Sequence, residues 1–225
     1  LANVPFILVD GADAFAEIGS DGVTGTKLVS LSGSVRRSGV AEVSMGTSLR
    51  DIIEGVGGGP ESGHTLTSVA VGGPSSGVLP LSMLDTAIAP GMLHDSGVML
   101  GAGGVIALDE RIPVVEVVRK LAAYNADESC GKCTPCREGT PRIVDALDRL
   151  LSGQGSSEEL EELRYLAEVV GLASLCGLGQ AAGGPITSGL HFFPEEFEAL
   201  VGDGGVKGAN HEHQAGGRWP RRGGV

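Results

Sequence analysis

The sequence predicts a mixed α+β fold, in which a small sheet region comes first and a bundle of helices follows. Alternating apolar and polar residues mark strands as far as Leu108, whereas apolar residues at helical spacing dominate after Asp109. Glycine accounts for 38 of the 225 residues without a three-residue period, which excludes collagen and indicates many turns. Aromatic residues are only 4% of the chain, so we expect a mainly aliphatic core.

Charge and hydropathy exclude several functional classes. The formal net charge of −12 argues against a protein that binds the phosphate backbone of a nucleic acid. No apolar run reaches the roughly 18 residues that a membrane span requires, so direct membrane insertion is not expected. Residues 1–16 lack a basic segment ahead of their apolar stretch and therefore do not resemble a secretory signal. These features predict a cytoplasmic protein.

A β-hairpin is predicted near the start of the chain. The short apolar run Pro5–Val9 is typical of a strand. From Leu28 to Val35 apolar residues alternate with serines, and this period of two indicates a half-buried strand. Residues 36–39 would form the turn that leads into a second alternating run, residues 41–45.

A short helix and two more strands are expected next. Thr47 can cap a helix whose apolar residues recur at i, i+3, i+4 and i+7, namely Leu49, Ile52, Ile53 and Val56. Leu66–Val71 and Val98–Leu108 predict strands, the second interrupted by glycines. Hairpin, helix and further strands are the order of a small β-grasp (ubiquitin-like) sheet, which we place at residues 25–110.

The remaining chain predicts a helical bundle at residues 111–202. Prolines suited to the first turn of a helix open four predicted helices: Pro113, Pro141, Pro185 and Pro194. Ser156 and Glu159 have the spacing of a capping box for a further helix, which we expect to end at Gly171. Residues 203–225 contain few aliphatic side chains and no period, so a disordered Gly-rich tail is expected there.

Four cysteines form the most informative pattern in the sequence. Cys130, Cys133 and Cys136 lie within seven residues, and Cys176 follows after 39 intervening residues. A disulfide framework would use more cysteines and spread them along the chain. Three thiolates separated by two residues suit an iron–sulfur cubane, because one loop can wrap one face while each sulfur reaches a different iron. A remote fourth cysteine completes such a set.

Two other uses of the cysteines remain open from the spacing alone. Structural zinc also favours four cysteines, but zinc ribbons use two separated pairs rather than three plus one. A redox disulfide would be expected in a thioredoxin-like βαβ context, which the sequence lacks. Residues 177–182 match a relaxed dinucleotide pattern, yet they follow a cysteine instead of a strand. His211 and His213 have a spacing that could bind a metal, but a solvated tail is the preferred interpretation, and the other histidines show no partners at ligand spacing: His64, His94 and His191.

Five segments carry a resemblance to a known family. Residues 25–35, 78–80, 99–110, 128–140 and 174–182 resemble the C-terminal two-thirds of the flavoprotein subunit of NADH dehydrogenases. The family includes the NADH-binding subunit of respiratory complex I, the diaphorase subunit of NAD-linked hydrogenases and the β subunit of NAD-linked formate dehydrogenases. The signature E-S-C-G-x-C-x-P-C-R-x-G is the most specific part of the match.

The resemblance implies an organisation in three parts: an FMN- and NADH-binding domain, a β-grasp (SLBB-like) domain and a helical bundle with one 4Fe–4S cluster. It implies that the cluster ligands are Cys130, Cys133, Cys136 and Cys176. Residues 1–24 would be the end of the flavin domain or a linker. The family's Gly-rich FMN loop is absent, so FMN and NAD(H) are expected on an upstream domain or on another chain.

The resemblance also implies a function and partners. The chain would pass single electrons from FMN, reduced by NADH, through its cluster to the clusters of partner subunits. Those partners would be a thioredoxin-like 2Fe–2S subunit and a larger iron–sulfur subunit, in the cytoplasm or at the cytoplasmic face of a membrane complex. The alternative is a non-redox scaffold protein with a four-cysteine metal site and a ligand-binding β-grasp domain.

Overall fold

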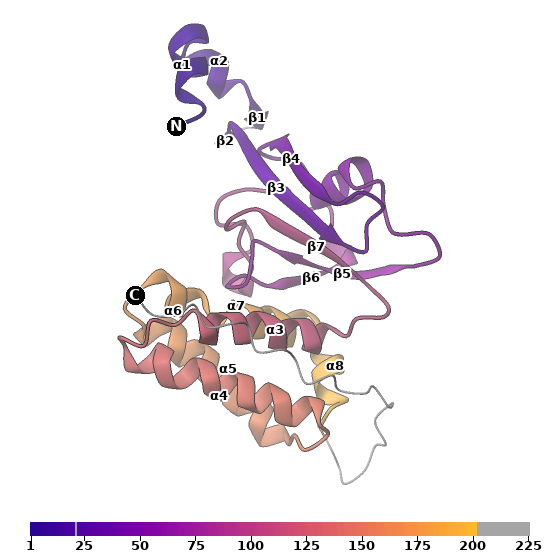
Figure 1. The fold of residues 1–225 in the computed structure, drawn as a ribbon, viewed down its shortest axis with the longest axis vertical. Helices are drawn as coiled ribbons and strands as arrows, with labels where there is room; N and C mark the ends of the chain where they lie inside the picture. Colours follow the sequence, from indigo (N-terminus) through magenta and orange to yellow (C-terminus); the bar gives the residue numbers. More distant parts are fainter. Residues whose placement is uncertain (21, 202–225) are drawn as a thin grey trace, which may run out of the picture.

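A computed structural model describes residues 1–20 and 22–201, which form a five-stranded sheet followed by packed helices (Figure 1). This arrangement confirms the predicted mixed α+β class. The predicted tail at residues 203–225, with His211 and His213, lies outside the described residues.

The first 24 residues contain the elements α1 (Val4–Asp10), α2 (Ala12–Ala16), β1 (Gly19–Ser20) and β2 (Val23–Thr24). The strand predicted at Pro5–Val9 is therefore wrong, because this segment forms α1. Pro5 occupies the first turn of that helix, where its missing N–H costs nothing. A short apolar run fits a helix as well as a strand when no neighbouring strand pairs with it.

The main sheet contains β3 (Thr26–Gly33), β4 (Gly39–Ser44), β5 (Leu66–Val71), β6 (Val78–Pro80) and β7 (Gly104–Asp109), in the order β4-β3-β7-β5-β6. The antiparallel pairing of β3 with β4 confirms the predicted hairpin. The last strand in sequence, β7, lies at the centre of the sheet, parallel to β3 and antiparallel to β5.

Two predicted details of this region need correction. The strand expected from Val98 begins only at Gly104, because Gly101 and Gly103 adopt positive φ angles of 49° and 89° that turn the chain. The predicted helix consists of residues 49–50 and the π-helical segment η1 (Asp51–Val56), and the side chain that accepts an N–H at its start is Ser48 instead of Thr47. The Asp51 N–H donates to Ser48 Oγ over 3.0 Å, whereas the Thr47 hydroxyl donates to the Ser44 carbonyl.

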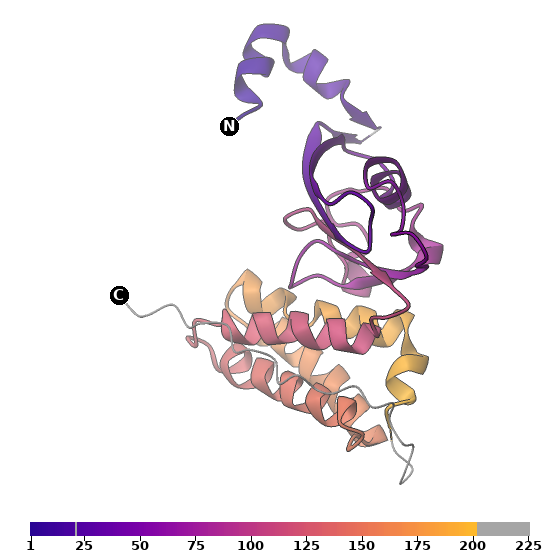
Figure 2. The same ribbon diagram turned by 45° about the vertical axis from the view of Figure 1, so that its right-hand side comes forward.

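Helices make up most of the chain after β7. Their bounds are α3 (Val114–Asp127), α4 (Thr134–Leu151), α5 (Ser157–Ala173), α6 (Gly177–Ala181), α7 (Gly184–Phe192) and α8 (Pro194–Glu198). α3 contacts α4 and α7, and α5 contacts the same two helices, so these four surround a common core (Figure 2). The capping box of Ser156 and Glu159 is present as predicted.

Two predicted helix boundaries in this part are wrong. α4 begins at Thr134 instead of Pro141, because Cys133 is extended and Pro135 lies in the first turn. Pro141 lies inside the helix, where it lacks the N–H that would bond to the carbonyl four residues earlier. α5 continues past Gly171 to Ala173.

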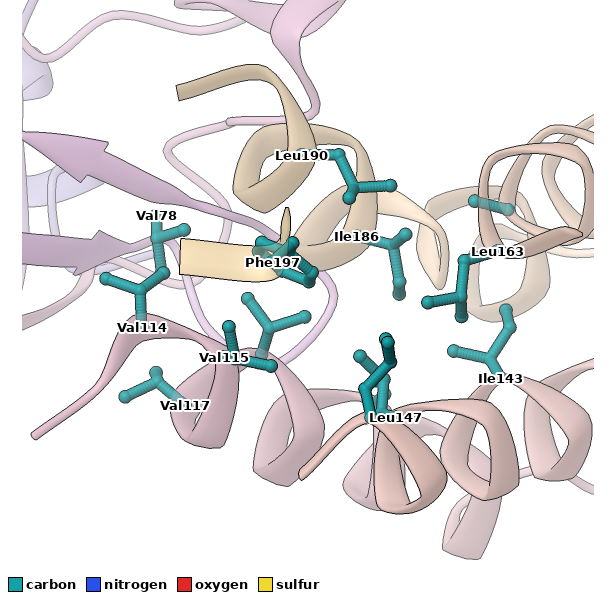
Figure 3. Packing of buried hydrophobic residues seen from close by; sticks show 14 of the residues in the cluster. Val78, Val114, Val115, Val117, Ile143, Leu147, Leu163, Ile186, Leu190 and Phe197 are labelled. Carbon is teal, nitrogen blue, oxygen red and sulfur yellow. The ribbon is translucent and has the colours of Figure 1, made fainter. Parts of the chain in front are cut away.

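The helical core is aliphatic, as expected, with one fully buried aromatic side chain among its described residues. Figure 3 shows Phe197 of α8 beside Ile186 of α7, with Leu147 of α4 facing the same core. Val78 of β6 lies near Val114 of α3, so this core reaches the edge of the sheet. A second cluster of buried side chains lies between the sheet and η1.

Buried polar contacts join the sheet to the helices. The Val78 N–H donates to Ser188 Oγ of α7 over 3.0 Å. Asn125, buried on α3, donates to the Pro74 carbonyl over 2.9 Å and accepts from the Ser75 hydroxyl over 2.6 Å. These bonds tie both α3 and α7 to the chain around β6. Within the described residues, no helix combines the length and hydropathy needed to cross a bilayer.

Candidate metal centre

Three of the four cysteines lie where α3 turns into α4. Cys130 is exposed in the connecting loop, Cys133 is the last residue before α4, and Cys136 lies in the first turn of α4, only 5% exposed. Gly131 adopts a φ of 74°, a left-handed conformation that glycine permits, and it turns the chain between the first two cysteines. The loop and the helix start therefore form one short, curved ligand segment.

Hydrogen bonds fix the shape of this segment. The Gly131 N–H donates to Ser129 Oγ over 3.3 Å, and the Arg137 guanidinium donates to the Gly131 carbonyl over 3.2 Å. The same Ser129 oxygen lies 3.2 Å from Cys136 Sγ. The loop thus brings a hydroxyl into contact with the buried cysteine.

The remote Cys176 is brought to this loop by the segment between α5 and α6. Cys176 is extended and immediately precedes α6. Gly179, in α6, packs against α4: a Cβ at this position would lie 3.2 Å from the Cys136 Cβ and would overlap the side chain of Ser174. The structure therefore places the Ser174–Gly179 segment directly against the cysteine loop.

The surroundings favour the thiolate form of Cys133. The pKa of its thiol is lowered, first by the backbone N–H of Leu175, next by that of Cys136 and further by the Ser174 hydroxyl, although burial acts in the opposite direction. The N-terminus of α4, an 18-residue helix, adds a partial positive charge at the same point. Since a thiolate is the form of cysteine that binds metals, these groups prepare Cys133 to be a ligand.

The donor set fits an iron–sulfur cluster better than a single zinc ion. All four cysteines are free thiols. In the described part of the chain, no three of their sulfur atoms lie within 4.8 Å of one another. Tetrahedral zinc, with Zn–S bonds of about 2.3 Å, would hold its sulfurs about 3.8 Å apart. Furthermore, Ser174 Oγ is buried without a standard hydrogen-bond partner, which fits a group that supplies sulfur acceptors at this place.

A second cluster of ligand-type side chains lies at the end of β7. His64 Nδ1 is 3.0 Å from Glu110 Oε1, a partner 46 residues away that no ligand spacing in the sequence indicates. Asp109 completes the group but is fully buried and held by the guanidinium of Arg111. Because that cation already neutralises Asp109, we interpret the group as an ion-pair cluster. Asp109 and Glu110 follow His64 by 45 and 46 residues in sequence, beyond any motif spacing.

Comparisons with known proteins agree with this geometry. Residues 116–200 match the family model "NADH-ubiquinone oxidoreductase-F iron-sulfur binding region", and residues 28–79 match the SLBB domain. The chain is 41% identical over 202 residues to the HndC subunit of the NADP-reducing hydrogenase of Solidesulfovibrio fructosivorans, covering 90% of this chain and 41% of the relative. It is 38% identical over 201 residues to the F 2 subunit of the NADH-quinone oxidoreductase of Rhizobium meliloti (strain 1021), covering 89% and 48%.

A solved structure gives the same result for the fold. An NAD⁺-reducing [NiFe]-hydrogenase, in its H₂-reduced state, matches with a TM-score of 0.78 and 32% identity, covering 89% of this chain and 33% of that chain. The chain spans less than half the length of these relatives. It carries the iron–sulfur binding region of the NADH-quinone oxidoreductase F family, and its resemblance to the flavoprotein subunits of NADH dehydrogenases is thereby confirmed.

Proposed function

We propose that the chain is the electron-transfer module of an NADH dehydrogenase or diaphorase-type flavoprotein subunit. Its proposed ligands for one 4Fe–4S cluster are Cys130, Cys133, Cys136 and Cys176. The observation that carries the proposal is the packing of Gly179 against Cys136, which brings the segment of Cys176 to the three-cysteine loop. The match of residues 116–200 to an iron–sulfur binding region supports it independently.

The proposal assigns a role to each part of the chain. Residues 25–110 form a β-grasp domain, supported by the hairpin, the central β7 and the SLBB match. Residues 111–202 form the cluster-binding helical bundle, and residues 1–24 are the end of a flavin domain or a linker. FMN and NAD(H) are proposed to bind outside this chain's described residues, on an upstream domain or a partner chain.

The chain's own residues hold the cluster and control its surroundings. When bound, a 4Fe–4S cluster accepts and releases one electron at a time. The backbone N–H groups of Leu175 and Cys136 lower the pKa of the Cys133 thiol and so favour its charged form. Exposed Lys132 and Arg137 add positive charge beside the loop. Ser129 and Gly131 fix the loop so that the ligands are positioned before the metal arrives.

Electron transfer would connect this cluster to neighbouring redox groups. Electrons would enter from FMN and leave for the clusters of a thioredoxin-like 2Fe–2S subunit and a larger iron–sulfur subunit. We place this reaction in the cytoplasm or at the cytoplasmic face of a membrane complex. The exposed position of Cys130 and Cys176 leaves this side of the site accessible to such partners.

Metal analysis of anaerobically purified protein tests the ligand set. The wild-type chain should contain about four iron and four sulfide per molecule. Cys176→Ala should lose most of that iron, because an open iron corner is labile, while the adjacent Leu175→Ala keeps the backbone N–H and should retain it. Stoichiometric zinc without iron after anaerobic reconstitution would contradict the proposal and favour the non-redox scaffold.

A further inference from the structure

The starting point is a buried hydroxyl group with no ordinary partner. Ser174 is 6% exposed, and its Oγ makes no hydrogen bond of standard geometry. Only one other described side chain shares this state, Ser68 in β5. Buried polar groups are nearly always hydrogen-bonded, so an unpaired one needs a physical reason.

The surroundings of Ser174 supply that reason. Gly179 of α6 confines the serine, because a Cβ at residue 179 would overlap both Ser174 Cβ and Oγ. The same point lies 3.2 Å from Cys136 Cβ, so the hydroxyl is held beside the cysteine loop. The hydroxyl is therefore packed into a fixed place beside one proposed ligand, with no competing acceptor of standard geometry among the described residues.

A second hydroxyl lies in direct contact with a proposed ligand of the same loop. Ser129 Oγ accepts the Gly131 N–H and lies 3.2 Å from Cys136 Sγ. In a free thiol either atom could donate across this contact. A metal-bound thiolate carries no proton, so Ser129 must then be the donor.

We propose that the hydroxyls of Ser129 and Ser174 donate hydrogen bonds to the thiolates of the cysteine loop, Ser129 to Cys136, and so raise the reduction potential of the cluster. This inference rests on the proposed ligand set. Reduction adds one electron to the cluster, breaks no bond and moves no proton. The reduced cluster carries one more negative charge, so donors to its sulfurs stabilise it more than the oxidised form.

Removing each hydroxyl tests the proposal. Ser174→Ala and Ser129→Ala are compared with Ser68→Ala, which removes the other unpartnered hydroxyl, in the sheet. The cluster potential is measured by redox titration followed by electron paramagnetic resonance, with iron content determined on the same samples. Ser174→Ala should disfavour reduction about tenfold, equivalent to about 59 mV for one electron. Ser129→Ala should shift the potential in the same direction, and Ser68→Ala should leave it unchanged.

Further outcomes separate this proposal from its alternatives. Ser129→Thr keeps the hydroxyl at a half-buried position and should retain the wild-type potential. Partial iron loss in Ser174→Ala does not prevent the test, because the resonance signal reports only loaded molecules. Loaded Ser174→Ala and Ser129→Ala with wild-type potentials would overturn the inference and leave the serines a packing role. A wild-type chain without iron would instead refute the proposed function.

Discussion

Replacing Gly179 with alanine should release the cluster, because this glycine is the contact between α6 and the cysteine loop. A Cβ at residue 179 would approach Ser174 Cβ about 1 Å closer than the ~3.5 Å at which carbon atoms touch. Neither neighbour can yield by rotation, since the overlap involves a Cβ atom and Cys136 Cβ lies 3.2 Å away on the other side. α6 must therefore move outward by about that amount and carry Cys176 with it.

The size of this displacement decides whether Cys176 can remain a ligand of the cluster. Metal–ligand distances tolerate only about 0.2 Å, so a movement of roughly 1 Å removes Cys176 from the ligand set. Overpacking should also cost about 1–3 kcal/mol of folding free energy. Gly177, two residues earlier in the same helix, provides a matched control, because nothing lies within 4 Å of its hypothetical Cβ.

The assay is iron and sulfide analysis of both variants, together with the thermal unfolding midpoint. We expect Gly177→Ala to retain the wild-type iron content, whereas Gly179→Ala retains less than a full cluster and unfolds at a lower temperature. Equal iron content and equal thermal unfolding midpoints for the two variants would show that the close packing of α6 at Gly179 is not needed to hold Cys176 in the ligand set. That result would refute the packing argument.

Three further predictions address the core, an ion pair and the flavin. Phe197→Ala, which removes the one fully buried aromatic ring of the described helical core, should lower the free energy of unfolding by about 3–5 kcal/mol in denaturant titrations; less than 1 kcal/mol would contradict its core position. Arg111 holds the pKa of Asp109 below its ordinary value, so this pair stabilises the fold at neutral pH and the contribution disappears as the pH falls below about 4. Asp109→Asn should therefore have a lower free energy of unfolding than wild type at pH 7, and denaturant titrations should show this difference becoming smaller as the pH falls below about 4. A difference that does not change with pH would contradict the prediction. Finally, the 225-residue chain should neither bind FMN tightly nor oxidise NADH, and stoichiometric quenching of flavin fluorescence would refute this.

Local signals in the sequence predicted the elements that depend on neighbouring residues. The strand Leu66–Val71 and the capping box of Ser156 with Glu159 match the structure, because alternation and capping act within a few residues. The cysteine loop was also predicted from a local signal, the spacing of Cys130, Cys133 and Cys136. The iron–sulfur interpretation of that spacing is supported by the match of residues 116–200.

The features that the sequence could not predict depend on distant parts of the chain. Pro5–Val9 has no strand beside it and forms a helix, which only the tertiary structure decides. Pro141 is a strong start signal in isolation, yet the earlier signals at Cys133 and Pro135 begin the helix first. The packing of Gly179 against Cys136 joins segments about 40 residues apart, and the spacing of the cysteines does not give its atomic contacts.

The central position of β7 constrains the order in which the protein can be assembled during synthesis. β3 pairs with β4 at once, but its other edge stays open until Gly104 arrives opposite Ser30, more than 70 residues later. An open strand edge is a site of mispairing, so the nascent sheet needs protection for that interval. Since α3 starts soon after β7 ends, the helices and then Cys176 come last. With the proposed ligand set, the cluster can therefore be completed only after all five strands of the sheet have been synthesised, because Cys176 follows the end of β7 by 67 residues.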